Sequence, residues 1–236
     1  MTVPQSAVKY ILFQRTQYLI CLKSRLLNRL VIRMPSKTFN WAVSVEALFT
    51  RSRVERLFEA DMKAEYESIK PYLPEQAAAI LDIGCGVAGI DVKLAEHYKA
   101  SKQEVTLSLL DKTEMPEKVY YGFEKKGCYY NSLAVARELL EANGIAPKQI
   151  MTQEVGADGQ ITFTGPFDLV TSLISWGFHY PVKTYLAQVH ALLRSGGVLI
   201  LDVRKDSTGV AEIKKQFGNI KIIAEFRKHQ RVAATK

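Results

Sequence analysis

The chain has 236 residues, of which 47% are hydrophobic and 24% charged, as is typical of one folded domain with an appended segment. Three widely spaced cysteines exclude a disulfide framework and a zinc-ligand spacing, and no apolar run reaches the ~20 residues of a membrane span. The net charge of +8 lies almost wholly before Glu46, where seven basic residues stand without an acidic one. The remainder is nearly neutral, which disfavours a nucleic-acid partner, and we expect a cytoplasmic protein without a metal site.

The first part of the chain predicts a basic helical extension. Apolar residues at helical spacing predict one long helix over residues 6–33, ended at Pro35, and further helix over residues 43–69. The first helix has two apolar stripes, which predict packing on two sides and make a homodimer reasonable. The acid-free residues 1–40 suggest peripheral contact with an anionic membrane at its inner face. The alternative is a packing helix whose charges are solvated.

The rest of the chain alternates strands and helices. Strands are expected at residues 78–83, 105–110, 150–155, 167–174 and 197–203, with a terminal hairpin at 220–226 and 231–234. Helices are expected at residues 90–98, 131–142, 181–193 and 210–217. This alternation predicts an α/β fold with a doubly wound, mainly parallel, seven-stranded sheet. We place this domain at residues 76–236, behind an extension of residues 1–75.

The strongest motif lies where the first of these strands ends. It reads Asp82-Ile83-Gly84-Cys85-Gly86, followed by Gly89 at the start of a helix. The glycine spacing alone also fits a dinucleotide-binding turn. Asp82 discriminates, because a carboxylate repels a pyrophosphate but attracts the ammonium group of S-adenosylmethionine. Asp111 ends the second strand and can accept the ribose hydroxyls of either ligand. A methyl donor is therefore favoured over a dinucleotide, and a tight turn without a ligand is the third alternative.

Segments in this order resemble class I S-adenosylmethionine-dependent methyltransferases. They are the turn from Asp82 to Gly86, Asp111, residues 167–170 and residues 192–200. The resemblance covers residues 76–205 and implies a Rossmann-like domain that binds S-adenosylmethionine. It also implies that Asp82, Gly84, Cys85 and Gly86 hold the methionine part and that Asp111 holds the ribose.

Three further residues complete the expected cofactor site. Lys112 stands where the family often has an apolar residue against the adenine, so its ammonium group is expected to reach outward. Asp158 follows the third strand and either meets the adenine amino group or forms a plain Asp-Gly turn. Ser172 lies at the end of the fourth strand, where the cofactor and acceptor are expected to meet.

The acceptor region is expected just after Ser172. It lacks the Asn/Asp-Pro-Pro-Tyr/Phe signature of enzymes that methylate amide or base nitrogens. His179 is our candidate general base for a hydroxyl acceptor, because imidazole titrates near neutral pH. The alternative is a histidine that orients or caps the next helix. Trp176, Phe178 and Tyr180 either line the acceptor site or only pack the loop.

A second aromatic segment, residues 119–132, is long enough to form a lid and includes Tyr121 as a candidate acceptor contact. Asn131 in this segment is alternatively a helix N-cap. Together with residues 175–181, the segment resembles uncharacterised bacterial proteins described as sugar O-methyltransferases. The leading hypothesis is therefore methyl transfer to a hydroxyl of a carbohydrate, lipid-linked glycan or other small metabolite. The alternatives are an RNA methyltransferase with a basic arm and a non-catalytic cofactor-binding module.

Overall fold

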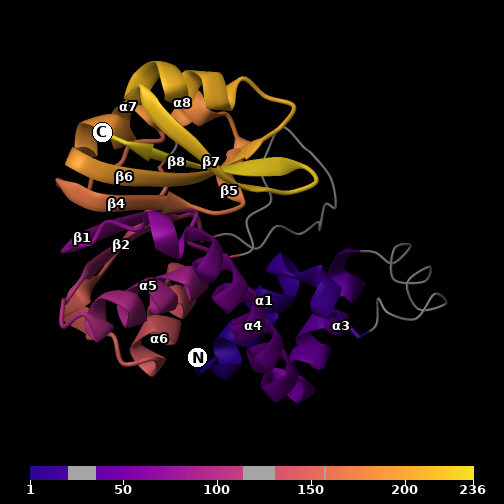
Figure 1. Ribbon diagram of the computed structural model, residues 1–236. Coiled ribbons are helices and arrows are strands. Elements are labelled where there is room, and N and C mark those ends of the chain that lie inside the picture. Colours follow the sequence, from indigo (N-terminus) through magenta and orange to yellow (C-terminus); the bar gives the residue numbers. More distant parts are fainter. Residues whose placement is uncertain (21–35, 114–130, 157) are drawn as a thin grey trace.

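The computed structural model describes residues 1–20, 36–113, 131–156 and 158–236, and it forms one sheet with helices on both sides (Figure 1). Seven strands pair in the order β3-β2-β1-β4-β6-β8-β7. These strands are β1 (Ala79–Ile83), β2 (Thr106–Asp111), β3 (Ile150–Glu154), β4 (Phe167–Ser172), β6 (Leu193–Arg204), β7 (Asn219–Glu225) and β8 (His229–Thr235). The helices are α1 (Gln5–Gln14), α3 (Ser36–Phe49), α4 (Arg51–Ile69), α5 (Gly89–Ala100), α6 (Leu133–Ala142), α7 (Leu186–Leu192) and α8 (Gly209–Phe217).

The sheet has the predicted α/β, doubly wound, mainly parallel architecture. Strands β1, β2, β3, β4 and β6 pair in parallel, whereas β8 runs antiparallel to β6 and β7. The strand order reverses between β1 and β4. Open sheets of this kind bind ligands beyond the carboxyl ends of the strands at such a reversal. The fold therefore points to the carboxyl ends of β1 and β4, beyond Ile83 and Ser172, as the place where a ligand would bind.

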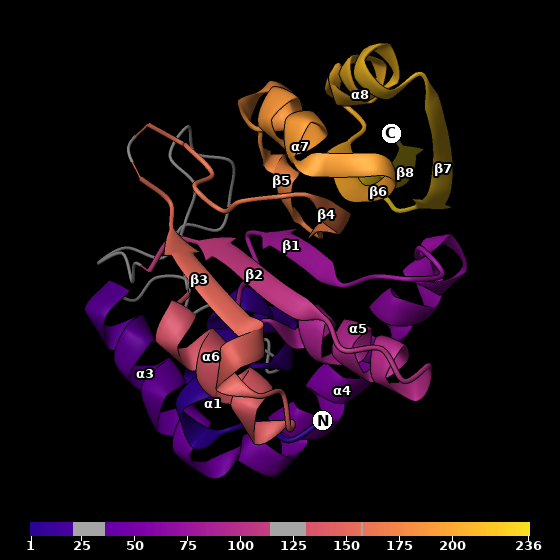
Figure 2. The ribbon, with the colours of Figure 1, turned by 90° about the vertical axis from the view of Figure 1, so that its left-hand side faces the viewer.

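Side chains that alternate along the strands divide the core into two layers. Ile80 of β1 joins a cluster with residues of α1, α3, α4, α5 and α6, whereas Leu81 joins a second cluster with α7 and α8. Leu169 and Val170 of β4 divide in the same way. Figure 2 shows α5 and α6 on one side of β1, β2 and β3, with α1, α3 and α4 on that same side. Burial on both faces explains why these strands are continuous apolar runs.

The N-terminal helices differ from the prediction of one helix over residues 6–33. Helix α1 ends at Gln14, because Arg15 leaves the helical conformation with φ −128° and ψ 68°. A 3₁₀ turn over Thr16–Tyr18 follows, and it returns the chain toward α4, where the Tyr18 hydroxyl donates to Asp61. The rest of the predicted helix, residues 21–35, lies outside the described residues.

Two other predicted elements are also divided. The helix expected over residues 43–69 is interrupted at Thr50, whose hydroxyl donates to the Glu46 carbonyl at 2.8 Å. The helix expected over residues 181–193 is a 3₁₀ turn, Val182–Thr184, followed by α7. Within the described residues, no helix combines the length and apolarity needed to cross a bilayer.

Candidate functional site

The glycine turn after β1 is shaped by backbone conformations that favour glycine. Gly84 and Gly86 have φ values of +74° and +57°. The Gly84 amide donates to the Leu110 carbonyl at 2.7 Å, which joins the turn to the end of β2. A Cβ atom on Gly84 would overlap the Ser175 hydroxyl, and one on Gly86 would lie 3.0 Å from the Gln14 side-chain oxygen. The turn is therefore closely packed between the strand β5 (Ser175–Tyr180) and the end of α1, and sequence reasoning did not identify Gln14.

Two buried carboxyl groups lie together beside this turn. Asp82 is the next-to-last residue of β1 and Asp91 lies in the first turn of α5, and the two influence each other's ionisation. Burial, and then the neighbouring Asp91, raise the pKa of Asp82 well above its usual range. Burial raises the pKa of Asp91 to about 7. The Thr171 hydroxyl donates to Asp82 at 3.1 Å, whereas neither carboxylate oxygen of Asp91 makes a hydrogen bond of good geometry in the described chain, and Asp82 is the side chain that interacts with it.

This pair has no counterion within the described residues, since neither carboxylate takes part in an ion pair there. An unpaired buried carboxylate is costly, so the arrangement favours a ligand that brings positive charge. Sequence reasoning identified Asp82 but missed Asp91. The available signal was an acidic residue inside the short apolar stretch Gly89–Val92 that opens α5.

Asp111 lies where it was expected, at the carboxyl end of β2. Its two carboxylate oxygens accept from the Gly86 amide at 2.8 Å and from the Lys112 amide at 2.6 Å. Burial raises the pKa of Asp111 to about 6, and the two backbone donors oppose that shift. The carboxylate therefore joins the glycine turn to β2 at the carboxyl ends of β1 and β2. Lys112 beside it is half-buried.

Asn131 does not cap helix α6, contrary to the N-cap alternative. The N-cap is Ser132, whose hydroxyl oxygen accepts from the Val135 amide at 3.4 Å. The Asn131 amide is instead buried beside Asp111, where it favours the charged carboxylate. Neither of its polar atoms makes a hydrogen bond of good geometry in the described chain. Asn131 therefore joins the group of polar residues at the carboxyl ends of β1 and β2.

The Ser172 hydroxyl makes its hydrogen bonds within the protein. Its hydroxyl donates to the Ile83 carbonyl at 2.6 Å and accepts from the Trp176 amide at 3.0 Å. The side chain is completely buried. Ser172 thus joins the ends of β1 and β4, which corrects its assignment as a direct cofactor contact.

The segment after β4 forms an unpredicted strand, β5 (Ser175–Tyr180), which lies outside the order of the sheet. Trp176 in this strand is completely buried, donates from Nε1 to the Val182 carbonyl at 2.9 Å and packs edge-on against Tyr185. It belongs to the core beneath α7 and α8. The expectation that Trp176 lines the acceptor site is therefore wrong, because its side chain lies entirely within the core.

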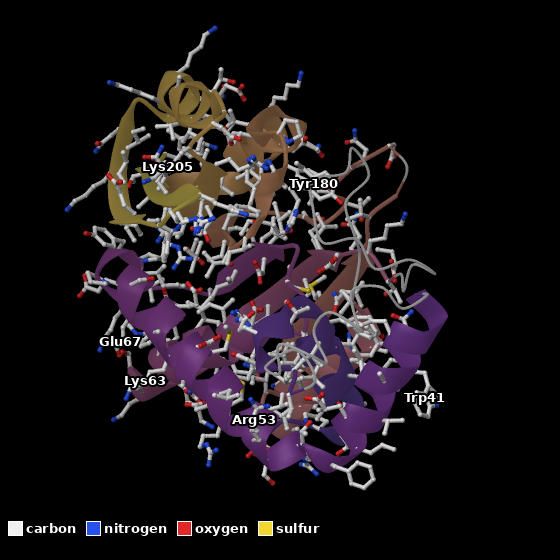
Figure 3. The ribbon with its side chains drawn as sticks, turned by 90° about the vertical axis from the view of Figure 1, so that its right-hand side faces the viewer. Trp41, Arg53, Lys63, Glu67, Tyr180 and Lys205 are labelled. Carbon is white, nitrogen blue, oxygen red and sulfur yellow. The ribbon has the colours of Figure 1, made fainter. Side chains whose placement is uncertain are left out.

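Phe178, His179 and Tyr180, at the end of β5, lie nearer to solvent. His179 is exposed, with its ring edge-on to Phe178 at 5.0 Å between centroids. The protein atoms packed around the imidazole ring partly desolvate it, and this lowers the pKa of His179. The positive charge of Arg204 lowers the pKa further, so the imidazole is neutral near pH 7. Phe178 and Tyr180 are half-buried. Figure 3 shows Tyr180 and Lys205 in the part of the molecule opposite α3 and α4.

One predicted contact is not brought into the site, and another lies outside the described residues. Asp158 is exposed, and its carboxylate accepts from the Gln160 amide at 3.2 Å in a turn closed by Gly159 and Gly156. This geometry is that of the plain Asp-Gly turn. Tyr121 and most of the expected lid, residues 119–130, lie outside the described residues.

Comparison with known proteins supports the fold. No protein-family model and no curated protein sequence matches the chain. The structure of the 16S rRNA N2 G1207 methyltransferase of T. thermophilus, in complex with AdoMet and guanosine, is similar over 74% of this chain at 16% identity and a TM-score of 0.50. The match spans only 41% of that enzyme. A methyltransferase of Pyrococcus furiosus is similar over 74% of this chain and 82% of its own, at 17% identity and a TM-score of 0.51. The chain has the fold of the class I S-adenosylmethionine-dependent methyltransferases.

Proposed function

We propose that the protein binds S-adenosylmethionine and transfers its methyl group to a hydroxyl of a small molecule, such as a carbohydrate. The observation that supports this most is the buried pair of Asp82 and Asp91 beside the glycine turn, with no described counterion. S-adenosylmethionine carries a positive ammonium and a positive sulfonium group. A cation placed beside two buried carboxyl groups is strongly stabilised in a medium of low dielectric constant.

A dinucleotide fits the same turn less well. A pyrophosphate would bring two negative charges close to Asp82, Asp91 and Asp111, and none of these has a described ion-pair partner. Like charges within a few ångströms of each other repel by several kcal/mol at an effective dielectric constant of about 20, which is typical of protein sites. The acidic residues thus favour the methyl donor over NAD.

In the proposed reaction, His179 accepts the proton of the acceptor hydroxyl as the methyl group moves from the sulfonium sulfur to the hydroxyl oxygen. The sulfur leaves as a neutral thioether and the imidazole becomes protonated. A general base must be neutral at the working pH, and the lowered pKa of His179 meets this requirement. Phe178 and Tyr180 offer half-buried aromatic faces beside it, which suit a sugar ring or a flat apolar acceptor. The likeness to an rRNA methyltransferase supports the fold alone, and the nearly neutral body of this chain argues against RNA as acceptor.

Calorimetry with S-adenosylhomocysteine and with NADH tests the cofactor directly. We expect S-adenosylhomocysteine to bind and NADH not to bind, and the reverse result would contradict the proposal. A methyl-transfer assay against a panel of hydroxylated acceptors then tests the chemistry. His179→Ala is expected to retain cofactor binding and to lower turnover about 10²–10⁴-fold. His190→Ala is the matched control, because His190 packs on Phe217 of α8. Full activity of His179→Ala would remove His179 from the mechanism.

A further inference from the structure

Helix α3 has apolar side chains on two opposite faces. Its inner face, Phe39, Val43 and Ala47, is buried in the core shared with α1 and the sheet. Its outer side holds Trp41, Leu48 and Phe49, which are 68%, 64% and 83% exposed. We call these three residues the outer face of α3. Figure 3 shows Trp41 projecting away from the body of the protein.

The outer face is a continuous feature rather than scattered exposure. Positions 41 and 48 are separated by two helical turns and position 49 adjoins them, so the three side chains lie on one side of the helix. Single exposed apolar residues are ordinary, but an aromatic and aliphatic group on one helix face indicates an interaction surface. None of the three makes a hydrogen bond or ring contact within the described chain that would explain its position.

The chain around the outer face carries an excess of basic residues, of which Arg15 is paired with Asp61 of α4. Residues 1–20 and 36–56 contain six basic residues and two acidic ones. Arg51 and Arg53 donate to the carbonyl oxygens of Val3 and Tyr18, which have no formal charge. Neither these two guanidinium groups nor that of Arg56 forms an ion pair within the described residues. The region thus combines an apolar helix face with a net positive field.

We propose that the outer face of α3 docks on an anionic phospholipid bilayer. Tryptophan and phenylalanine partition into the headgroup region, and the arginine residues that follow α3 in sequence are attracted to anionic lipid. A second copy of the chain is a poorer occupant, because a symmetric contact would place two positive regions against each other. This inference is independent of the proposed methyl transfer and adds a location at which that reaction would take place.

The chain contains its own probe for this contact. It has two tryptophans, and Trp176 is completely buried, so a lipid-dependent change in tryptophan emission reports Trp41. On titration with vesicles of phosphatidylcholine and phosphatidylglycerol, we expect a blue shift of the emission and quenching by brominated acyl chains. Vesicles of phosphatidylcholine alone should give neither change. Added salt should weaken binding, because the charges are exposed.

Variants separate docking from folding. Leu48→Ser with Phe49→Ser is expected to lower the apparent affinity for the anionic vesicles by about tenfold or more, as sedimentation measures. Trp41→Phe should abolish the fluorescence change but retain most of the sedimentation. Ile222→Ser removes another exposed apolar side chain, 45% exposed on β7, and should leave both signals intact. Unchanged circular dichroism spectra and unfolding midpoints would show that the variants fold.

Three results would overturn the proposal. One is the absence of any shift and of cosedimentation with anionic vesicles, and another is equal binding to neutral vesicles. The third is a blue shift that depends on protein concentration without lipid, together with a dimer in sedimentation velocity, which would identify the outer face as a self-association surface.

Discussion

Asp91 is the residue whose environment departs most from what its side chain requires. An aspartate in the first turn of a helix is normally stabilised by exposed amides and by solvent. Here the carboxyl group is completely buried, has no hydrogen-bond partner of good geometry in the described chain and faces a second carboxyl group, that of Asp82. Two such groups cannot both ionise at low cost, so the pair of carboxyl groups holds a proton that a cationic ligand would displace.

The pH dependence of stability tests this description. The pKa of Asp91 is about 7 in the folded protein and about 3.9 in an unfolded chain. A raised pKa means that the folded state binds the extra proton, so the stability contribution is complete below about pH 4 and is lost as the pH rises through 7. We expect the ligand-free protein to lose on the order of 2 kcal/mol between pH 5 and pH 8, measured by urea unfolding.

Asp91→Asn should reduce this pH dependence, because it removes one of the two interacting acids, and it should leave the contributions of Asp82 and Asp111, whose pKa values burial also raises. Glu104→Gln is the matched control, because Glu104 is exposed and the substitution also removes one carboxylate. An unfolding midpoint of the wild-type protein that stays constant from pH 5 to pH 8 would contradict the raised pKa of Asp91 in the folded protein.

Among the residues of the site, the sequence predicted those that belong to a recognisable motif. Asp82, Gly84, Gly86 and Asp111 are brought together at the carboxyl ends of β1 and β2, because a turn needing positive φ leaves a recognisable glycine pattern. Asp91 was missed because one acidic residue within a helix is not a motif. Trp176 was misplaced because the direction of its side chain depends on a strand that the sequence did not reveal.

At the scale of elements, all seven strands of the sheet were predicted in order, since buried parallel strands are continuous apolar runs between helices. Two features escaped prediction. The end of α1 depends on Tyr18 packing onto α4, a contact between segments far apart in sequence. Strand β5 was expected as a loop because its sequence mixes aromatic and polar residues, and its position comes from packing against β6.

Gly177 fixes how closely β5 approaches β6. It has φ +82°, and a Cβ atom there would lie 2.6 Å from the Asp202 carbonyl oxygen. Gly177→Ala should therefore destabilise the protein by about 1–3 kcal/mol and displace Phe178 and His179. Gly196→Ala is the matched control, with φ +76° but no atom near the added carbon, so it measures the backbone strain alone. Urea unfolding of both variants should give the larger loss for Gly177→Ala, and equal losses would show that contact with β6 does not matter.

At the scale of the whole molecule, the N-terminal helices are part of the same core as the sheet. Val8, Ile11 and Leu12 of α1 are completely buried in the cluster that includes Leu107 and Leu109 of β2. Composition and charge set residues 1–75 apart in sequence, but they do not reveal that these residues pack on α5 and α6. We therefore expect one cooperative unfolding transition rather than two.

A buried ionic cluster crosses the sequence boundary between these parts and makes that expectation testable. Arg231 of β8 is completely buried and binds both carboxylate oxygens of Asp202 at 2.7 Å, and it also pairs with Glu65 of α4 at 2.6 Å. Arg231→Met should cost about 3–5 kcal/mol, because Asp202 would remain buried without its partner. Glu65→Gln should cost less, since the Glu65 side chain keeps 17% exposure and the Asp202 pair remains intact. Calorimetric scans should show one lowered transition for each variant. A separate low-temperature transition in Arg231→Met, with the main one unchanged, would mean that the helices of residues 1–75 unfold independently of the sheet.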